Sequence, residues 1–173
     1  MCIRDSLWWR RPLGWRRRLG VVVMLSRRAF LRRLDSHAVE QAIARVETRT
    51  SGEIRVSIAR FFLGNSRRLA EHAFQRLGMH ATRDRNGVLL LIAPARHQVV
   101  VLGDEGIHGK VGDAFWTEIA ARVSTRFREG RFTEGVVEAV DTIGEALVRH
   151  FPADPEAGGN PNELPDSIDL GHS

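Results

Sequence analysis

The sequence is poor in residues that often carry chemistry, with one cysteine, one lysine and no tyrosine among 173 residues. The cysteine is Cys2, so no internal disulfide, thiolate zinc site or cysteine nucleophile is available beyond it. Long apolar runs are also missing. Residues 19–25 form the longest near the start, whereas a membrane helix needs about 20 residues. This run lacks a small-residue cleavage site as well, so we expect a cytoplasmic protein without signal peptide or membrane helix.

Several enzyme signatures are absent. The P-loop pattern fails because Asp104 stands where its first glycine belongs, and because Lys110 is followed by Val111 instead of Ser or Thr. There is no His-Glu-x-x-His pair and no nucleophile elbow, and Arg96-His97-Gln98 lacks the glycine of histidine phosphatases. The usual phosphatase nucleophiles are therefore excluded.

The positive charge is confined to one end of the chain. Residues 1–34 carry ten arginines and Asp5, a net of 10 − 1 = +9, while residues 35–173 carry 16 basic and 20 acidic groups, a net of 16 − 20 = −4. A mildly acidic domain is not expected to bind nucleic acid. The N-terminal arginines leave two alternatives open: RNA binding, or a weak contact with an anionic membrane surface, which would place the protein at the membrane periphery.

The chain divides into three parts. We expect a basic extension over 1–34, a folded domain over 35–151, and a tail rich in Pro, Asn and Asp over 152–173. Residues 1–6 match the translation of a transposase adaptor left at the ends of sequence assemblies. The natural start is therefore expected at Met24.

Apolar periodicity predicts alternating helices and strands in the domain. Asp35 or Ser36 caps a helix that ends near Thr50, and residues 53–58 alternate as in a strand with one buried face. A second helix follows Gly64-Asn65-Ser66 and stops at Gly78. The remaining predicted elements are strands over 88–93 and 98–103 that form a hairpin, a glycine-rich loop over 103–112 ending in Asp113 as a cap, and two helices separated by Gly130, the second capped by Thr133. The order α-β-α-β-β-α-α predicts an α/β fold, a three-layer αβα sandwich with a small mixed sheet.

The hairpin predicts one cluster of oxygen-bearing side chains. If the turn centres on Ala95-Arg96, paired residues sum to about 191, so Gly87 lies opposite Asp104. Asp84 and Asn86 then approach Asp104 and Glu105 at one end of the sheet. Carboxylate and amide oxygens suit Ca²⁺ or Mg²⁺, which makes these four residues the candidate metal ligands.

A simpler interpretation stays open beside the metal site. Asp84 and Asn86 are also typical of a turn into a strand, and adjacent acids such as Asp104 and Glu105 are common in loops. His108 could ligate or titrate, although a lone loop histidine is more often solvated.

An ordered set of motifs carries a family resemblance. These are Asp84-Arg85-Asn86-Gly87 before 88–93, Gly103-Asp104-Glu105-Gly106-Ile107, Phe115-Trp116, residues 127–132, Glu134-Gly135-Val136 and Asn162-Glu163-Leu164-Pro165. Together they resemble the short, soluble bacterial branch of the TPM-domain family, which is named for a thylakoid lumen protein, a photosystem repair protein and a modulator of acetylcholine receptors.

The resemblance implies an αβα sandwich, a link to membrane-protein assembly or maintenance, and association with LemA-type membrane proteins. Acid phosphatase activity is claimed for plant members. Many bacterial relatives carry a signal peptide and a C-terminal membrane helix, and this chain departs from them in showing neither.

Two functions follow as hypotheses. The first is a binding or accessory module that engages a protein partner, for which the resemblance suggests a LemA-type membrane protein. The second is a divalent-metal-dependent, acid-phosphatase-like hydrolase built on Asp84, Asp104 and Glu105. We favour the binding module, because the sequence offers no activated nucleophile or general base.

Overall fold

The computed structural model describes residues 2–7, 26–60, 64–153 and 165–171. The predicted start at Met24, the arginines at 10–18 and the Asn162-Glu163-Leu164 motif lie outside these ranges. In chain order the elements are β1 (Cys2–Leu7), α1 (Arg27–Leu31), α2 (Ser36–Glu47), β2 (Ile54–Ile58), α3 (Ser66–Arg76), η1 (Met79–Ala81), β3 (Val88–Ala93), η2 (Pro94–Arg96), β4 (Gln98–Gly103), α4 (Glu105–Arg128) and α5 (Phe132–His150).

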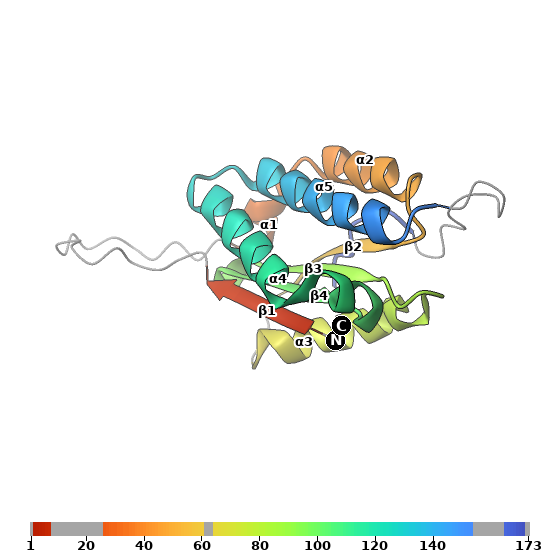
Figure 1. Cartoon of the computed structure of the whole chain (residues 1–173). Helices are drawn as coiled ribbons and strands as arrows, with labels where there is room; N and C mark the ends of the chain where they lie inside the picture. The colour runs from red at the N-terminus through yellow and green to blue at the C-terminus, as the bar shows by residue number, and fades with distance from the viewer. Residues whose placement is uncertain (1, 8–25, 61–63, 154–164, 172–173) are drawn as a thin grey trace, which may run out of the picture.

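Four strands form a mixed sheet in the order β1-β4-β3-β2, with β2 parallel to β3 and the other two pairs antiparallel. Alternate residues of β3 and β4 face two separate apolar cores. Val88, Leu90 and Ile92 pack with α2, α4 and α5, while Leu89 and Leu91 pack with α3. Figure 1 shows α3 alone beneath the sheet and the other long helices above it. The predicted three-layer αβα sandwich is confirmed.

Residues 54–58 form a strand, as their two-residue period predicts, but the prediction that only one face of this strand is buried is wrong. All five residues of β2 are buried, including Arg55 and Ser57. The C-terminal segment covers this edge, because Ile58 N donates to Asp169 O at 2.8 Å and Asp169 N donates to Val56 O at 2.9 Å. The chain thus protects one edge of its sheet with its own tail.

The hairpin register is confirmed. Val88 lies opposite Gly103, and Asp104 N donates to Gly87 O at 3.0 Å. The turn uses η2 and His97, whose φ of 52° is in the left-handed region. Gly78 ends α3 with φ 72°, also as predicted.

Two predictions about the C-terminal helices are wrong. The segment 103–112 is not a loop, because α4 begins at Glu105 with Asp104 as its N-cap. Gly112, with φ 70°, kinks the helix where the loop was expected to end. Thr133 does not cap α5. Its hydroxyl oxygen instead accepts a hydrogen bond from Asp35 N at 2.9 Å and ties α5 to the start of α2.

The packed domain extends N-terminal of residue 35. Ser26 caps α1, and Phe30 is fully buried. Its ring centroid lies 5.6 Å from that of Phe127 and 5.0 Å from that of Phe132. This aromatic cluster joins α1 to the C-terminal end of α4 and the N-terminal end of α5. Helix α1, which lies in the basic segment, therefore packs against the hydrophobic core.

In the described ranges, no helix combines the length and apolarity needed to cross a bilayer.

Candidate functional site

The candidate site lies where β2 and β3 begin and β4 ends. We call it the sheet-end cluster and define it as Ser51, Asp84, Arg85, Asn86, Asp104 and Glu105. The β3–β4 register brings the loop before β3 close to Asp104 and Glu105, as the sequence predicts, and these residues begin α4. The approach is close, because a Cβ on Gly106 would collide with the carbonyl oxygen of Asp84.

Arg85 holds the centre of the cluster. Its Nε donates to Asp104 Oδ2 at 2.7 Å and its Nη2 donates to Asp104 Oδ1 at 2.9 Å. Its carbonyl oxygen accepts from Gly106 N at 2.9 Å. Arg85 adopts φ 51°, and this left-handed turn precedes β3. The sequence analysis passed over Arg85, although an arginine beside Asp84 in a motif predicted to approach Asp104 and Glu105 was a signal for an ion pair.

Asp104 is fully buried and its carboxylate is fully engaged. Besides the two bonds from Arg85, its Oδ1 accepts from Glu105 N at 2.8 Å and caps α4. The hydrogen bonds to Asp104 raise the pKa of Arg85 above its ordinary value. This fork geometry fixes the start of α4 on the loop before β3.

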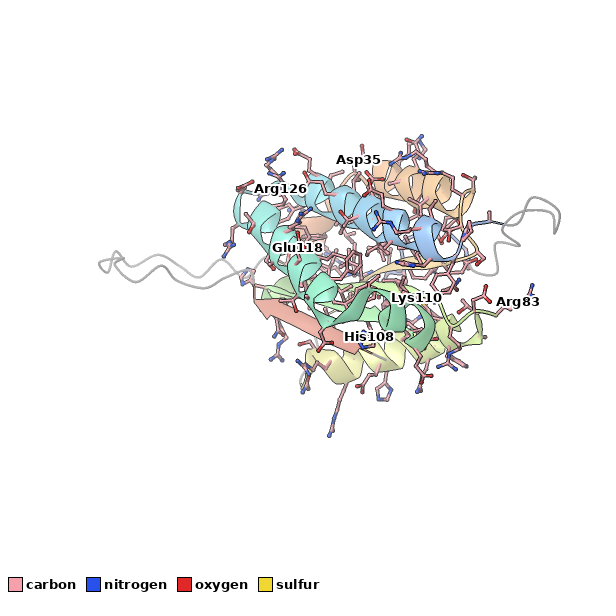
Figure 2. All side chains as sticks on the ribbon, in the orientation of Figure 1. Asp35, Arg83, His108, Lys110, Glu118 and Arg126 are labelled. Carbon is pink, nitrogen blue, oxygen red and sulfur yellow. The ribbon has the colours of Figure 1, made fainter. Side chains whose placement is uncertain are left out.

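Ser51 links the two polar residues of the loop. Its Oγ donates to Asp84 Oδ2 at 3.1 Å and accepts from Asn86 Nδ2 at 3.1 Å. Asn86 is fully buried, and its Oδ1 has no hydrogen-bond partner among the described residues. Asp84 is exposed, and Figure 2 shows the neighbouring Arg83 extending outward from the same loop. The simpler interpretation of Asp84 and Asn86 as a turn into a strand is compatible with these contacts.

Glu105 lies at the outer side of the cluster. Its side chain is 71% exposed, and its Oε1 is 3.8 Å from Arg85 Nη2. Within the ranges that the structure describes, no three His, Cys, Asp or Glu side chains form a group that could hold a metal ion. Arg85 lies between the acids and uses both oxygens of Asp104, so a cation at this position would have to displace a guanidinium. The metal site at Asp84, Asn86, Asp104 and Glu105 stays a prediction.

His108 is half-buried, and its side chain is hydrogen-bonded to a tryptophan of the hydrophobic core. Trp116 Nε1 donates to His108 Nδ1 at 3.2 Å, and the Trp116 ring packs directly on Gly103. Figure 2 shows His108 and Lys110 on the first turns of α4. The imidazole therefore satisfies a buried indole N–H.

A second polar cluster lies at the β2 edge and was missed by the sequence analysis. We call it the tail-edge network; its members are Glu47, Glu53, Arg55, Ser57, Arg76, Asp166 and Asp169. Glu47, Glu53 and Arg55 are each at most 4% exposed. Burial raises the pKa of Glu47 to about 9, although its Oε1 accepts from Ile54 N at 2.9 Å. Burial also lowers the pKa of Arg55, against the attraction of the surrounding carboxylates.

Asp169 ties the tail into this network. Its Oδ2 accepts from Ser57 Oγ at 2.6 Å and from Arg76 Nη2 at 2.7 Å. Burial alone would raise the pKa of Asp169, but the bonds from Arg76 and Ser57 outweigh it and the pKa lies below its usual value. The sequence contained a signal for this network. The strand has Glu, Arg and Ser on its polar face, and the tail contains acidic residues that could pair with them.

A hollow of about 170 Å³ lies between α4 and α5 and is lined by Ile119, Arg122, Glu138, Ala139 and Thr142. None of the lining residues belongs to the sheet-end cluster. The ion pairs Arg85–Asp104 and Arg76–Asp169 each join separate elements of the fold.

Comparisons with known proteins agree with this architecture. Residues 26–146 match the family model described as the TPM domain. Among solved structures, the NMR structure of BA42 protein from the psychrophilic bacterium Bizionia argentinensis has a TM-score of 0.71 and 33% sequence identity, with 79% of this chain and 92% of that chain covered. No curated protein matches the chain. The family match spans well over half of the sequence and confirms the resemblance, so this chain belongs to the TPM-domain family.

Proposed function

We propose that this TPM-domain protein is a binding module, an accessory protein that engages a membrane-linked protein partner. The observation that carries the proposal is the state of Asp104, the acid at the centre of the candidate site. It is buried, held by two bonds from Arg85, and used as a helix cap. A carboxylate engaged in this way supports structure and is poorly placed to move a proton.

The partner class follows from the family. A LemA-type membrane protein is the partner that the resemblance favours, with a role in membrane-protein assembly or maintenance. We place the module on the cytoplasmic side, at the membrane periphery. The exposed Arg28 in α1, and Arg32 and Arg33 just after it, would add a weak attraction to anionic lipid, worth about 1 kcal/mol for each arginine near the surface.

Affinity capture tests the proposal directly. The full chain carrying a C-terminal tag would be used as bait in detergent-solubilised membranes of a native host, and bound proteins identified by mass spectrometry. We expect an integral membrane protein to be retained at ionic strengths that remove lipid contacts. Recovery of soluble proteins alone, in repeated captures, would contradict the proposal. The Arg28→Ala/Arg32→Ala/Arg33→Ala variant is the control for binding through lipid, and it should retain the partner.

A metal-dependent acid phosphatase is the second candidate, and one observation favours it. The Oδ1 atom of Asn86 is buried without a hydrogen-bond partner among the described residues, beside the exposed Asp84. Such an oxygen is a possible ligand for Ca²⁺ or Mg²⁺. Calorimetry with either ion at millimolar concentration decides the matter, because a parent protein that gives no heat of binding has no metal for this chemistry.

A further inference from the structure

Exposed arginines gather at the end of the sheet where β2 and β3 finish. We call this surface the arginine end. Its members come from α1 and the turn after it, from the exit of β2, from the first turn of α3 and from η2; they are Arg28, Arg32, Arg33, Arg60, Arg68 and Arg96. All six are exposed.

Contacts between these segments hold the six residues at one end of the domain. Helix α1 contacts η2. Arg96 Nη1 donates to Gly64 O at 2.8 Å, which ties η2 to the loop before α3. Ala59 N donates to Ile92 O at 2.8 Å, so Arg60 leaves β2 beside the end of β3. Figure 1 shows α1 and the first turn of α3 toward the same end of the sheet.

Most charges of the arginine end are not offset by an ion pair. Among the described residues, no ion pair involves Arg28, Arg32, Arg33, Arg60 or Arg68. The arginines at the junction of α4 and α5 differ in this respect, because Arg126 is paired with Glu138 and Arg131 with Glu134. The arginine end therefore keeps its positive charge available to a partner.

The rest of the domain has the opposite charge. Outside the arginine end, the described residues carry 15 basic and 18 acidic groups, a net of 15 − 18 = −3. The sheet-end cluster lies at the other end of the six-residue strand β3, about 17 Å away along the strand. A planar anionic surface attracts one end of such a domain and repels the remainder, so it fixes the orientation.

An apolar side chain accompanies the arginines. Leu170 is the one large apolar residue that is exposed in the part of the chain that the structure describes. It lies beside the exit of β2, because the next residue, Gly171, lies against the backbone of Ile58 and Arg60. In sequence, Phe, Phe and Leu follow Arg60; these three residues lie outside the described ranges and are not counted in the arginine end. Apolar residues interleaved with arginines are typical of surfaces that dock on lipid headgroups.

We infer that the arginine end is a docking surface for an anionic phospholipid bilayer, which holds the domain with its sheet-end cluster toward the aqueous side. The inference rests on the membrane-linked setting of the proposed function and adds the surface, the lipid class and the orientation. Guanidinium groups bind lipid phosphates, and each arginine near an anionic bilayer strengthens binding about fivefold. The contact is electrostatic, so salt weakens it.

Co-sedimentation of the full chain with vesicles tests the surface. The probe is a vesicle of phosphatidylcholine with about one-quarter phosphatidylserine, and pure phosphatidylcholine is the neutral reference. The test variant is Arg33→Gln/Arg60→Gln/Arg68→Gln. The matched control removes the same charge from exposed arginines at the other end of the sheet, and it is Arg49→Gln/Arg83→Gln/Arg149→Gln. Residues 1–25 are unchanged in both variants, so the basic extension contributes equally.

We expect the parent to bind the anionic vesicles and not the neutral ones. The test variant should bind at least about tenfold more weakly, because three arginines together contribute on the order of a hundredfold. The control should stay within about threefold of the parent, since its arginines lie beyond the screening length of the contact. Equal losses in both variants, or a parent that does not bind anionic vesicles, would overturn the inference.

A charge-conserving variant separates electrostatics from folding. Arg33→Lys/Arg60→Lys/Arg68→Lys should bind like the parent, and a folded lysine variant that has lost binding would overturn the inference. If circular dichroism shows that the glutamine variant is unfolded, Arg60→Gln/Arg68→Gln is compared with Arg83→Gln/Arg149→Gln. A loss of at least about fivefold in the first pair alone is then expected, and equal binding by the two pairs would overturn the inference.

The orientation has its own test. In a Cys2→Ser background, a nitrobenzoxadiazole label on Leu170→Cys should shift its emission to the blue when anionic vesicles are added, whereas the same label on Arg83→Cys should not. A shift at Arg83→Cys alone, or at neither position, would overturn the orientation. Anisotropy of a fluorescein-labelled single-stranded RNA covers the other polyanion. RNA binding that the glutamine variant loses, with vesicle binding unchanged, would assign the arginine end to nucleic acid and overturn the lipid class.

Protein-free vesicles separate this inference from the proposed function. A parent that does not bind them, but still captures an integral membrane protein in detergent, would overturn the lipid surface and leave the binding module intact. Vesicle binding through the arginine end, without any captured membrane protein, would leave the surface and remove the proposed function.

Discussion

Replacing Glu47 by Gln should stabilise the protein at neutral and alkaline pH and leave it nearly unchanged in acid. Burial raises the pKa of this carboxyl from 4.5 to about 9 in the folded state. Between these values the folded protein binds a proton that the unfolded chain does not bind, so the stability of the parent falls as pH rises. Glutamine is a neutral isostere whose oxygen can still accept from Ile54 N.

The magnitude follows from the size of the pKa shift. Each pH unit inside the window costs the parent about 1.4 kcal/mol, so the advantage of Glu47→Gln should grow by about 3 kcal/mol between pH 5.5 and 7.5. Relaxation of the fold or entry of water would reduce this figure, and an increase of about 1 kcal/mol still has the predicted sign.

Urea unfolding of both proteins at several pH values measures the effect. Glu118→Gln, on the exposed face of α4, is the control for a change of net charge. A difference between Glu47→Gln and the parent that stays constant from pH 5.5 to 8.5 would refute the assignment of a buried, protonated carboxyl. A loss of stability in the variant at pH 8 would refute it as well.

Three other expectations concern the ends of the chain. Phe30→Ala should destabilise the fold by about 3–5 kcal/mol in denaturant titrations, because the side chain is fully buried against two other rings, and a cost below 1 kcal/mol would show that α1 is peripheral. Deletion of residues 1–23 should preserve a single cooperative melt by circular dichroism, since the apolar residues of both described cores lie C-terminal to the deletion. Asp169→Asn should destabilise the protein at pH 7. Because the pKa of Asp169 is lowered from 3.8, its contribution is present above that pH and lost as pH falls further, so the difference from the parent should shrink in strong acid.

The elements with a clear period were predictable from the sequence. Helix α2, the turn at Gly78 and the β3–β4 register follow from local patterns and from the geometry of a short turn. Predictions from local patterns failed where tertiary contacts hold a glycine-containing segment in a helix. Residues 105–111 hold two glycines and still form a helix, because Asp104 caps it and Arg85 anchors that cap.

The candidate site was predictable in position but not in its contacts. The register correctly brought Asp84 and Asn86 near Asp104. The sequence could not show that Arg85 would turn back onto Asp104, because that contact depends on a left-handed backbone at Arg85. The burial of Arg55 also escaped prediction, since it requires a tail segment more than a hundred residues away to cover the β2 edge.

The central claim, that this TPM domain binds and does not hydrolyse, is tested most directly by a steady-state phosphatase assay on the parent and on Glu105→Gln. Glu105 is the exposed acid of the sheet-end cluster, so its replacement leaves the buried pair of Arg85 and Asp104 in place. With a phosphate monoester, and with Ca²⁺, Mg²⁺ or chelator, we predict background rates for both proteins. Saturable hydrolysis by the parent that falls about a hundredfold in Glu105→Gln would contradict the claim.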